Sequence, residues 1–188
     1  MKIMYARRLR SDRGEMSEFP VALLVFFFFA VFPLINLMLY AAACATVAFI
    51  TTQAADSAAS QSDYSTSLTS MQTVTTTLTN SGWGKFARLT PVGGYSNSGA
   101  NLWLVETKIV GGSTNLYGPN TPDPNAPDPK NNLYEYRVVT NFDIAPFVNL
   151  SAVPFIGSVP LIGAVAHLSY TVERNVEYPF TSTAAAGS

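Results

Sequence analysis

The sequence predicts an α+β fold: a long N-terminal transmembrane helix that continues as a stalk, followed by a small antiparallel β-sheet head covered by short helical segments. Three observations predict it. Residues 19–55 contain no charged side chain, and residues 51–80 contain neither glycine nor proline. Beyond them, three segments show the composition and alternation of strands. The 188 residues therefore divide into a leader (1–14), a transmembrane and stalk helix (15–80) and an extracytoplasmic head (81–188).

The leader is basic. It holds five of the 11 Lys and Arg residues and one acidic residue, whereas the whole chain has a net charge of −1. Basic residues beside a membrane segment stay in the cytoplasm, so we expect a cytoplasmic N-terminus and a head on the opposite side. A net charge this small provides no basic field for nucleic acid, which we do not expect as a partner.

The apolar run covers residues 19–50, or 32 residues, whereas about 20 span a bilayer. Secretory signals have apolar cores of only about 7–15 residues, so we expect a retained helix; cleavage at the small residues 43–45 is the alternative. Pro33 cannot donate to the Phe29 carbonyl, which predicts a kink. Cys44 is the only cysteine, which excludes an intrachain disulfide.

The stalk is predicted from a helical stripe over residues 51–80. If residues 19–79 formed one helix, it would be about 90 Å long. Asn80, Ser81 and Gly82 are a plausible end. The stripe consists of Ala54, Ala58, Gln61, Tyr64, Leu68, Met71, Val74 and Leu78.

The head is predicted to contain strands at residues 101–110, 133–142 and 167–178, and three strands are the minimum for an independently stable sheet. Between the first two lies a linker, residues 117–132, with two Pro-Asp-Pro units. Prolines at this spacing impose an extended path, so we expect a solvated hairpin loop.

Residues 142–166 form a second apolar stretch, which is interrupted by Pro146, Pro154 and Pro160. Prolines oppose a second spanning helix. Two interpretations stay open. The stretch forms short helical pieces that cover the sheet, or it exposes an apolar patch for a partner or for the bilayer surface.

We expect no enzymatic activity, metal or cofactor. His167 is the only histidine, which leaves no histidine-based triad and no multi-histidine metal site. Asp123, Asn125 and Asp128 in the linker have side chains that suit calcium, but Pro127 and the lack of a bidentate glutamate spoil the pattern. An anchored hydrolase would need a nucleophile beside a base, and no such pair is evident.

The N-terminal stretch RRLRSDRGEMSEFPVALLVFFFFAVFPLINL resembles the TadE/TadG-like minor pseudopilins of tight-adherence (Flp-type) pilus systems. Arg13, Gly14, Glu18 and Phe19 fit the Arg-Gly and Glu-Phe positions of that family, which precede a long apolar helix. The small-residue stretch AADSAASQS and the ending LSYTVERNVEYPF are also similar to it.

The resemblance implies a minor pseudopilin or pilus-assembly subunit in the bacterial inner membrane, with a periplasmic head. Its implied partners are other pilin-like subunits, assembly-platform proteins and a prepilin peptidase, which would cut after Gly14 and make Glu15 the new N-terminus. The family usually has five residues from glycine to glutamate, whereas Glu18 is four after Gly14. An uncleaved, anchored subunit therefore remains an alternative.

Glu18 is the candidate assembly residue, with Phe19 beside it. A carboxylate in an apolar bundle is costly unless it is paired, so Glu18 would meet the α-amino group of a neighbouring subunit and set the axial register. The alternative is an interfacial charge that ends the membrane segment. Another class of protein also fits: a membrane-anchored periplasmic module that binds a ligand between the sheet and residues 142–166.

Overall fold

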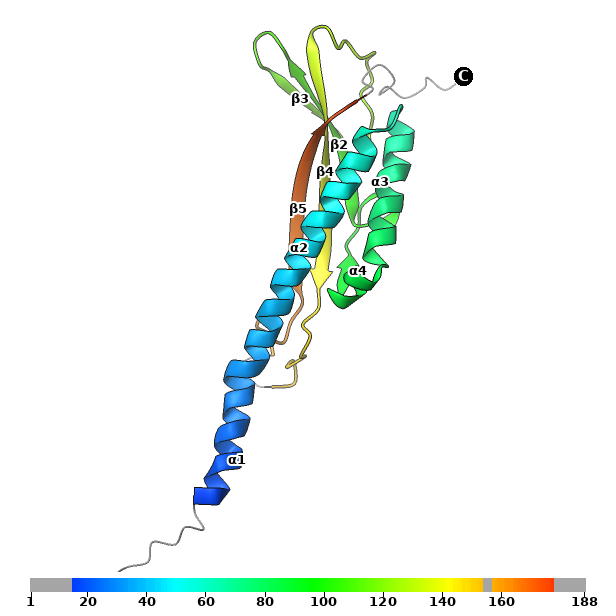
Figure 1. The fold of residues 1–188 in the computed structure, drawn as a ribbon. Coiled ribbons are helices and arrows are strands. Elements are labelled where there is room, and N and C mark those ends of the chain that lie inside the picture. The colour runs from blue at the N-terminus through cyan, green and yellow to red at the C-terminus, as the bar shows by residue number, and fades with distance from the viewer. Residues whose placement is uncertain (1–14, 154–156, 178–188) are drawn as a thin grey trace, which may run out of the picture.

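The computed structural model describes residues 15–153 and 157–177, with side chains from Glu18 onward. It confirms the α+β class: a long apolar N-terminal helix is followed by a small antiparallel sheet and short helices (Figure 1). The helical elements are α1 (Glu15–Phe26), the π turn η1 (Phe27–Val31), α2 (Phe32–Ala59), α3 (Tyr64–Thr79), α4 (Gly82–Phe86) and the short η2 (Tyr95–Asn97). The strands are β1 (Leu89–Pro91), β2 (Ala100–Lys108), β3 (Thr114–Tyr117), β4 (Asn132–Ile144) and β5 (Ala166–Asn175).

Helices α1 and α2 form one rod through the π turn η1. Just before Pro33, where the sequence predicts a kink, the helix has a π turn: the Phe32 N–H donates to the Phe27 carbonyl, five residues back. A π turn widens the helix locally, just ahead of the proline that cannot donate to Phe29. Between Glu18 and Ala59 the rod is long and apolar enough to cross a membrane, with a mean hydropathy of 2.6 in its most apolar window.

The prediction of one helix through residue 80 is wrong. Helix α2 ends at Ala59, the chain reverses, and α3 runs back beside α2 (Figure 1). Asp63 has an extended backbone, and its carboxylate accepts a 2.8 Å hydrogen bond from the Thr66 N–H, which starts the new helix. An aspartate at this position is a strong N-cap. The Ser67 hydroxyl then donates to the Ala58 carbonyl at 2.9 Å and ties the two helices together.

The sheet is centred on β4. One edge of β4 pairs with β5, and the other pairs with β2 and, beyond the end of β2, with β1; strand β3 pairs with the free edge of β2. The predicted strands at 101–110, 133–142 and 167–178 correspond to β2, β4 and β5. Strands β1 and β3 were not predicted, because three and four residues are too few to show a period.

The core lies between one face of the sheet and the α2–α3 hairpin. Alternate residues of β4 from Tyr134 to Ile144 point into it. Alanines of α2 meet them, so the helix axis lies close to the sheet. The two halves of the predicted stripe face the same core from antiparallel helices. The buried residues of this core include Ala54, Ala58, Tyr64, Leu68, Met71, Leu102, Leu104, Tyr136 and Val138.

The short helical pieces expected in residues 142–166 are not found in the described part of that segment. Its first residues complete β4, residues 145–153 and 157–165 form turns and irregular chain, and Ala166 begins β5. Pro154 lies outside the described residues. Pro146 and Pro160 explain the lack of helix, because each removes a helical hydrogen-bond donor.

Candidate functional site: the exposed half of the N-terminal helix

The predicted site residues lie at the start of the rod. Gly14 is outside the described residues, and Glu15 begins α1 with an undescribed side chain. Glu18 and Phe19 are both exposed, and Phe19 shows 67% of its surface. The structure therefore brings Glu18 and Phe19 to an accessible end of the molecule, and it leaves cleavage between Gly14 and Glu15 a prediction.

The first half of the rod, residues 18–38, is apolar on all sides and hardly covered. Of these residues, all of which the structure describes, only Asn36 is buried. A helix that is apolar all round requires surroundings that remove it from water. Its exposed large side chains are Phe19, Val21, Leu23, Leu24, Val25, Phe26, Phe27, Phe29, Leu34, Leu37 and Met38.

The second half of the rod, from Tyr40 to Ala59, is built into the head. One face of it is buried against the sheet at Ala43, Val47 and Ile50. Deeper in this interface the Thr51 and Thr140 hydroxyls are 2.6 Å apart, which joins α2 to β4. The head therefore fixes the direction in which the bare half of the rod projects.

Asn36 marks the junction between the two halves. Its side-chain amide donates to the Val148 carbonyl at 2.9 Å and its side-chain carbonyl accepts from the Val148 N–H at 2.8 Å. The polar interruption in the apolar run is thus fully satisfied by the loop after β4. A buried amide without such partners would cost free energy.

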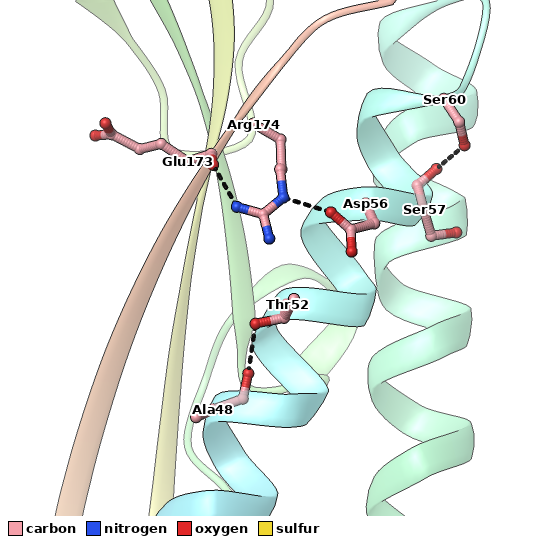
Figure 2. Close-up of polar contacts among 7 residues, drawn as sticks. All are labelled: Ala48, Thr52, Asp56, Ser57, Ser60, Glu173 and Arg174. Carbon is pink, nitrogen blue, oxygen red and sulfur yellow. Dashed lines mark hydrogen bonds and ion pairs between the residues drawn. The ribbon is translucent and has the colours of Figure 1, made fainter.

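Figure 2 shows a second tie between α2 and the sheet. Arg174 of β5 donates through Nε to Asp56 Oδ1 at 2.5 Å, and its guanidinium also donates to the Glu173 carbonyl. Both side chains of the Asp56–Arg174 pair are partly exposed, and such pairs contribute only about 0.2–1 kcal/mol. This pair therefore orients the helix more than it stabilises the fold.

Glu106 is a buried carboxylate that sequence reasoning missed. Burial raises its pKa, but hydrogen bonds from Asn115, Tyr134 and Tyr117, with the charge of Lys108, outweigh this and lower the pKa overall. The carboxylate oxygens accept from Tyr134 at 2.9 Å and from Tyr117 at 3.1 Å. The signal was present in β2, since Glu106 shares its face with Leu102 and Leu104.

Few ionisable groups gather elsewhere. Among residues 15–153 and 157–177, no group of three His, Cys, Asp or Glu side chains could hold a metal ion. His167 Nδ1 lies 2.9 Å from Asp143 Oδ1 on the exposed side of the sheet.

In the linker, which we expected to be a solvated loop, Asp123 is buried rather than solvated, and its carboxylate accepts a hydrogen bond from the Asn125 N–H at 2.8 Å.

The face of the sheet opposite the helices carries a shallow hollow of about 570 Å³. Across it, Arg137 of β4 and Glu173 of β5 form an ion pair of 2.5 Å. Trp103 of β2 is the register neighbour of Arg137 and lines the same hollow. An aromatic ring beside a charged pair is suited to contact with a polar molecule.

Comparisons with known proteins find no match. No protein-family model matches the chain, and no curated protein and no solved structure matches it. The geometry of the rod and the head therefore carries the functional interpretation.

Proposed function

We propose that the protein is a minor pseudopilin or pilus-assembly subunit of a tight-adherence pilus or related secretion system. One observation carries the proposal: the first half of the rod projects bare from the head, while the second half is locked into it. A projecting apolar helix packs equally well in lipid or among like helices, so it can serve as an anchor first and as an assembly element afterwards. The resemblance of residues 7–37 to TadE/TadG-like proteins supports the same role.

Glu18 supports assembly beyond simple anchoring. It is exposed and directly precedes the charge-free run. Carboxylates within a membrane bundle are costly and usually pair with a partner. In an assembly, the α-amino group of a neighbouring subunit would supply the positive charge, after cleavage between Gly14 and Glu15. Pairing of this kind would set the axial register between subunits.

Replacement of Glu18 by Gln tests the proposal. We expect the Glu18→Gln variant to reach the membrane at the normal level but to enter sheared surface fibres at least about tenfold less, as measured by immunoblot, because one lost charge pair of about 1.4 kcal/mol has that effect. Glu177→Gln is the matched control, since Glu177 is an exposed carboxylate of the head. Equal incorporation of both variants would remove the proposed role of Glu18.

The proposed location is the bacterial inner membrane, with a single spanning helix and a periplasmic head. The basic leader supports this orientation. Mass spectrometry of the native N-terminus distinguishes the processed form, which begins at Glu15, from the anchored form, which retains the leader.

A membrane-anchored ligand-binding module is the second candidate. The small cavity where the start of the 142–166 segment meets α2 and α4 offers only about 10 Å³, too little for more than a water molecule. The hollow beside Trp103 and Arg137 favours this function instead. A saturable change in Trp103 emission with small carboxylates, lost in Arg137→Gln, would support it; unchanged emission would count against it.

A further inference from the structure

We propose that the edge of the head nearest the bare half of the rod rests on the periplasmic surface of the bilayer. Trp83, Phe86 and Phe147 on this edge would lie in the interfacial layer of the lipid. This inference depends on the membrane anchoring in the proposed function, but it does not depend on pilus assembly. The proposed pairing of Glu18 concerns only the rod and does not explain the exposed aromatic residues of the head, to which this inference gives a role.

The aromatic edge comes from two separate segments. Trp83 and Phe86 belong to α4 and meet edge to face, with ring centroids 6.5 Å apart, and Phe147 follows β4. These side chains expose 74%, 51% and 49% of their surface. Three aromatic rings this exposed on one edge of a head with a well-filled core indicate a contact surface.

The edge lies at a defined height on the rod. Phe86 and Phe147 line the same small space as Asn36 and Tyr40 of α2. At 1.5 Å per residue, Asn36 lies about 26 Å and Tyr40 about 32 Å along the helix from Phe19. The hydrocarbon core of a bilayer is about 30 Å thick. A bilayer core that begins where the charge-free run begins therefore ends at the level of Phe86 and Phe147. Trp83 faces α2 between Ala42 and Phe49, about 3–14 Å further along the helix than Tyr40, in the headgroup layer.

The charges on the edge suit lipid headgroups. Lys85 is exposed on α4 between the two aromatic residues. Arg88 lies over the Phe147 ring, 4.9 Å from its centroid, and its guanidinium donates to the Pro146 carbonyl at 2.7 Å. These contacts join Arg88 to the loop that carries Phe147. Aromatic rings with Lys and Arg beside them are typical of membrane interfaces.

A hollow continues the aromatic edge up the side of the rod. It has a volume of about 390 Å³ and lies between Trp83 and the outer face of α2 at Ala45 and Phe49. Among the described residues that line this hollow and the space below it, none is acidic. The hollow has uncharged, mainly apolar walls beside the long apolar helix, and Arg88 lines the space below it. An apolar wall with a cation at its base favours an anionic lipid over a second copy of this chain.

Tryptophan fluorescence tests the inference on the full-length chain. The protein has two tryptophans, so Trp103→Phe leaves only Trp83 and Trp83→Phe leaves only Trp103 as the matched control. Trp103 lies near the level of Asp56 on the rod. In the sheet, Trp103 is opposite Arg137, and Arg137 is opposite Glu173. The next residue of β5, Arg174, binds Asp56. That level is about 24 Å beyond Tyr40 along the helix.

Each variant is reconstituted in nanodiscs of phosphatidylcholine and phosphatidylglycerol, with acyl chains brominated near the headgroup. We expect bromine to quench Trp83 at least about twofold more than Trp103, because interfacial aromatic rings contact the first acyl carbons. Aqueous iodide should show the opposite order. The unmodified protein, with both tryptophans, should be quenched to an intermediate extent.

The outcomes separate this inference from the proposed function. Chain retained in the bilayer with Trp83 and Trp103 quenched equally overturns the docking alone. Chain that carbonate washes from the bilayer overturns both the docking and the anchoring. Protection of Trp83 from iodide that increases with the number of copies per nanodisc, without bromine quenching, would place a second copy on the edge and overturn the lipid contact.

Discussion

Three polar residues, Asp63, Asn36 and Glu106, fix how neighbouring elements of this molecule are joined. Asp63 starts α3, Asn36 binds the loop after β4 to the rod, and Glu106 of β2 accepts hydrogen bonds from side chains of the neighbouring strands β3 and β4. Each is satisfied by neutral donors or acceptors rather than by an opposite charge. For Glu106, these hydrogen bonds outweigh the cost of burying the carboxylate, so that its pKa is lowered overall.

Asp63 should make the stability of the hairpin depend on pH. Hydrogen bonds from the hydroxyls of Ser65 and Thr66, and from the Thr66 N–H, lower its pKa to about 2. Because the pKa is lower in the folded state than the usual value near 3.9, the contribution is complete above about pH 4 and is lost as the pH falls toward about 2. Solvent screening of this carboxylate keeps the effect small.

The measurement compares thermal unfolding of the full chain in detergent by circular dichroism. Asp63→Ala should cost about 1 kcal/mol at neutral pH through loss of the N-cap. Asp63→Asn keeps a capping oxygen and should stay close to the parent at neutral pH, without its pH dependence between about 4 and 2. An unchanged pH profile in Asp63→Asn would contradict the assignment.

The elements combine through close approach of α2 to the sheet. Ala54, Ala55 and Ala58 are fully buried on one face of α2. Tyr64 of α3 and Tyr136 of β4 meet edge to face at 5.9 Å beyond them. Small side chains on α2 leave room for these large rings, so the hairpin and the sheet share one core.

Enlargement of Ala54 should show how tight this interface is. Ala54→Leu should destabilise the fold by about 1–3 kcal/mol, because Ala54 is fully buried in the core and the added carbons have no space there. Gln53→Leu is the matched control, since Gln53 is exposed one position away on the same helix, and it should change stability by less than about 0.5 kcal/mol. Urea unfolding in detergent measures both. Similar values for the two variants would mean that α2 is loosely packed.

At the scale of the whole molecule, the two halves of the rod differ in what surrounds them, because the head covers the second half and leaves the first half bare. Its bare half is suited to lipid or to a helix bundle, and its other half serves as the spine of the head (Figure 1). The head orients the bare half through core contacts and through the Asp56–Arg174 pair. A substitution in the bare half should therefore affect membrane anchoring and leave the head folded.

A charge in the bare half should reveal its depth in the bilayer. Phe29 lies near the middle of residues 19–39 and Met38 near their end, and both are exposed. Phe29→Arg should cost about 2.5–3.5 kcal/mol of insertion and reduce the carbonate-resistant fraction, whereas Met38→Arg can reach the interface and should stay anchored. Equal extraction of both variants would contradict a bilayer centred on Phe29.

The sequence alone determined the parts whose signals are local. A long charge-free run predicted a helix long and apolar enough to cross a membrane, and the structure has one. The alternation in β2, β4 and β5 identified those strands from a few neighbouring residues. Strand β3 and the turn at Ser60 had no comparable signal.

The tertiary structure decided what depends on residues far apart. Helical period continues smoothly from α2 into α3, so only the fit of both helices on one face of the sheet reveals the reversal between them. Asn36 and Val148 meet across 112 positions of sequence, and the aromatic edge joins α4 to the loop after β4. Such contacts form because the burial of apolar surface favours one arrangement of the whole chain. That arrangement depends on residues far apart in the sequence, so it cannot be predicted from a local pattern.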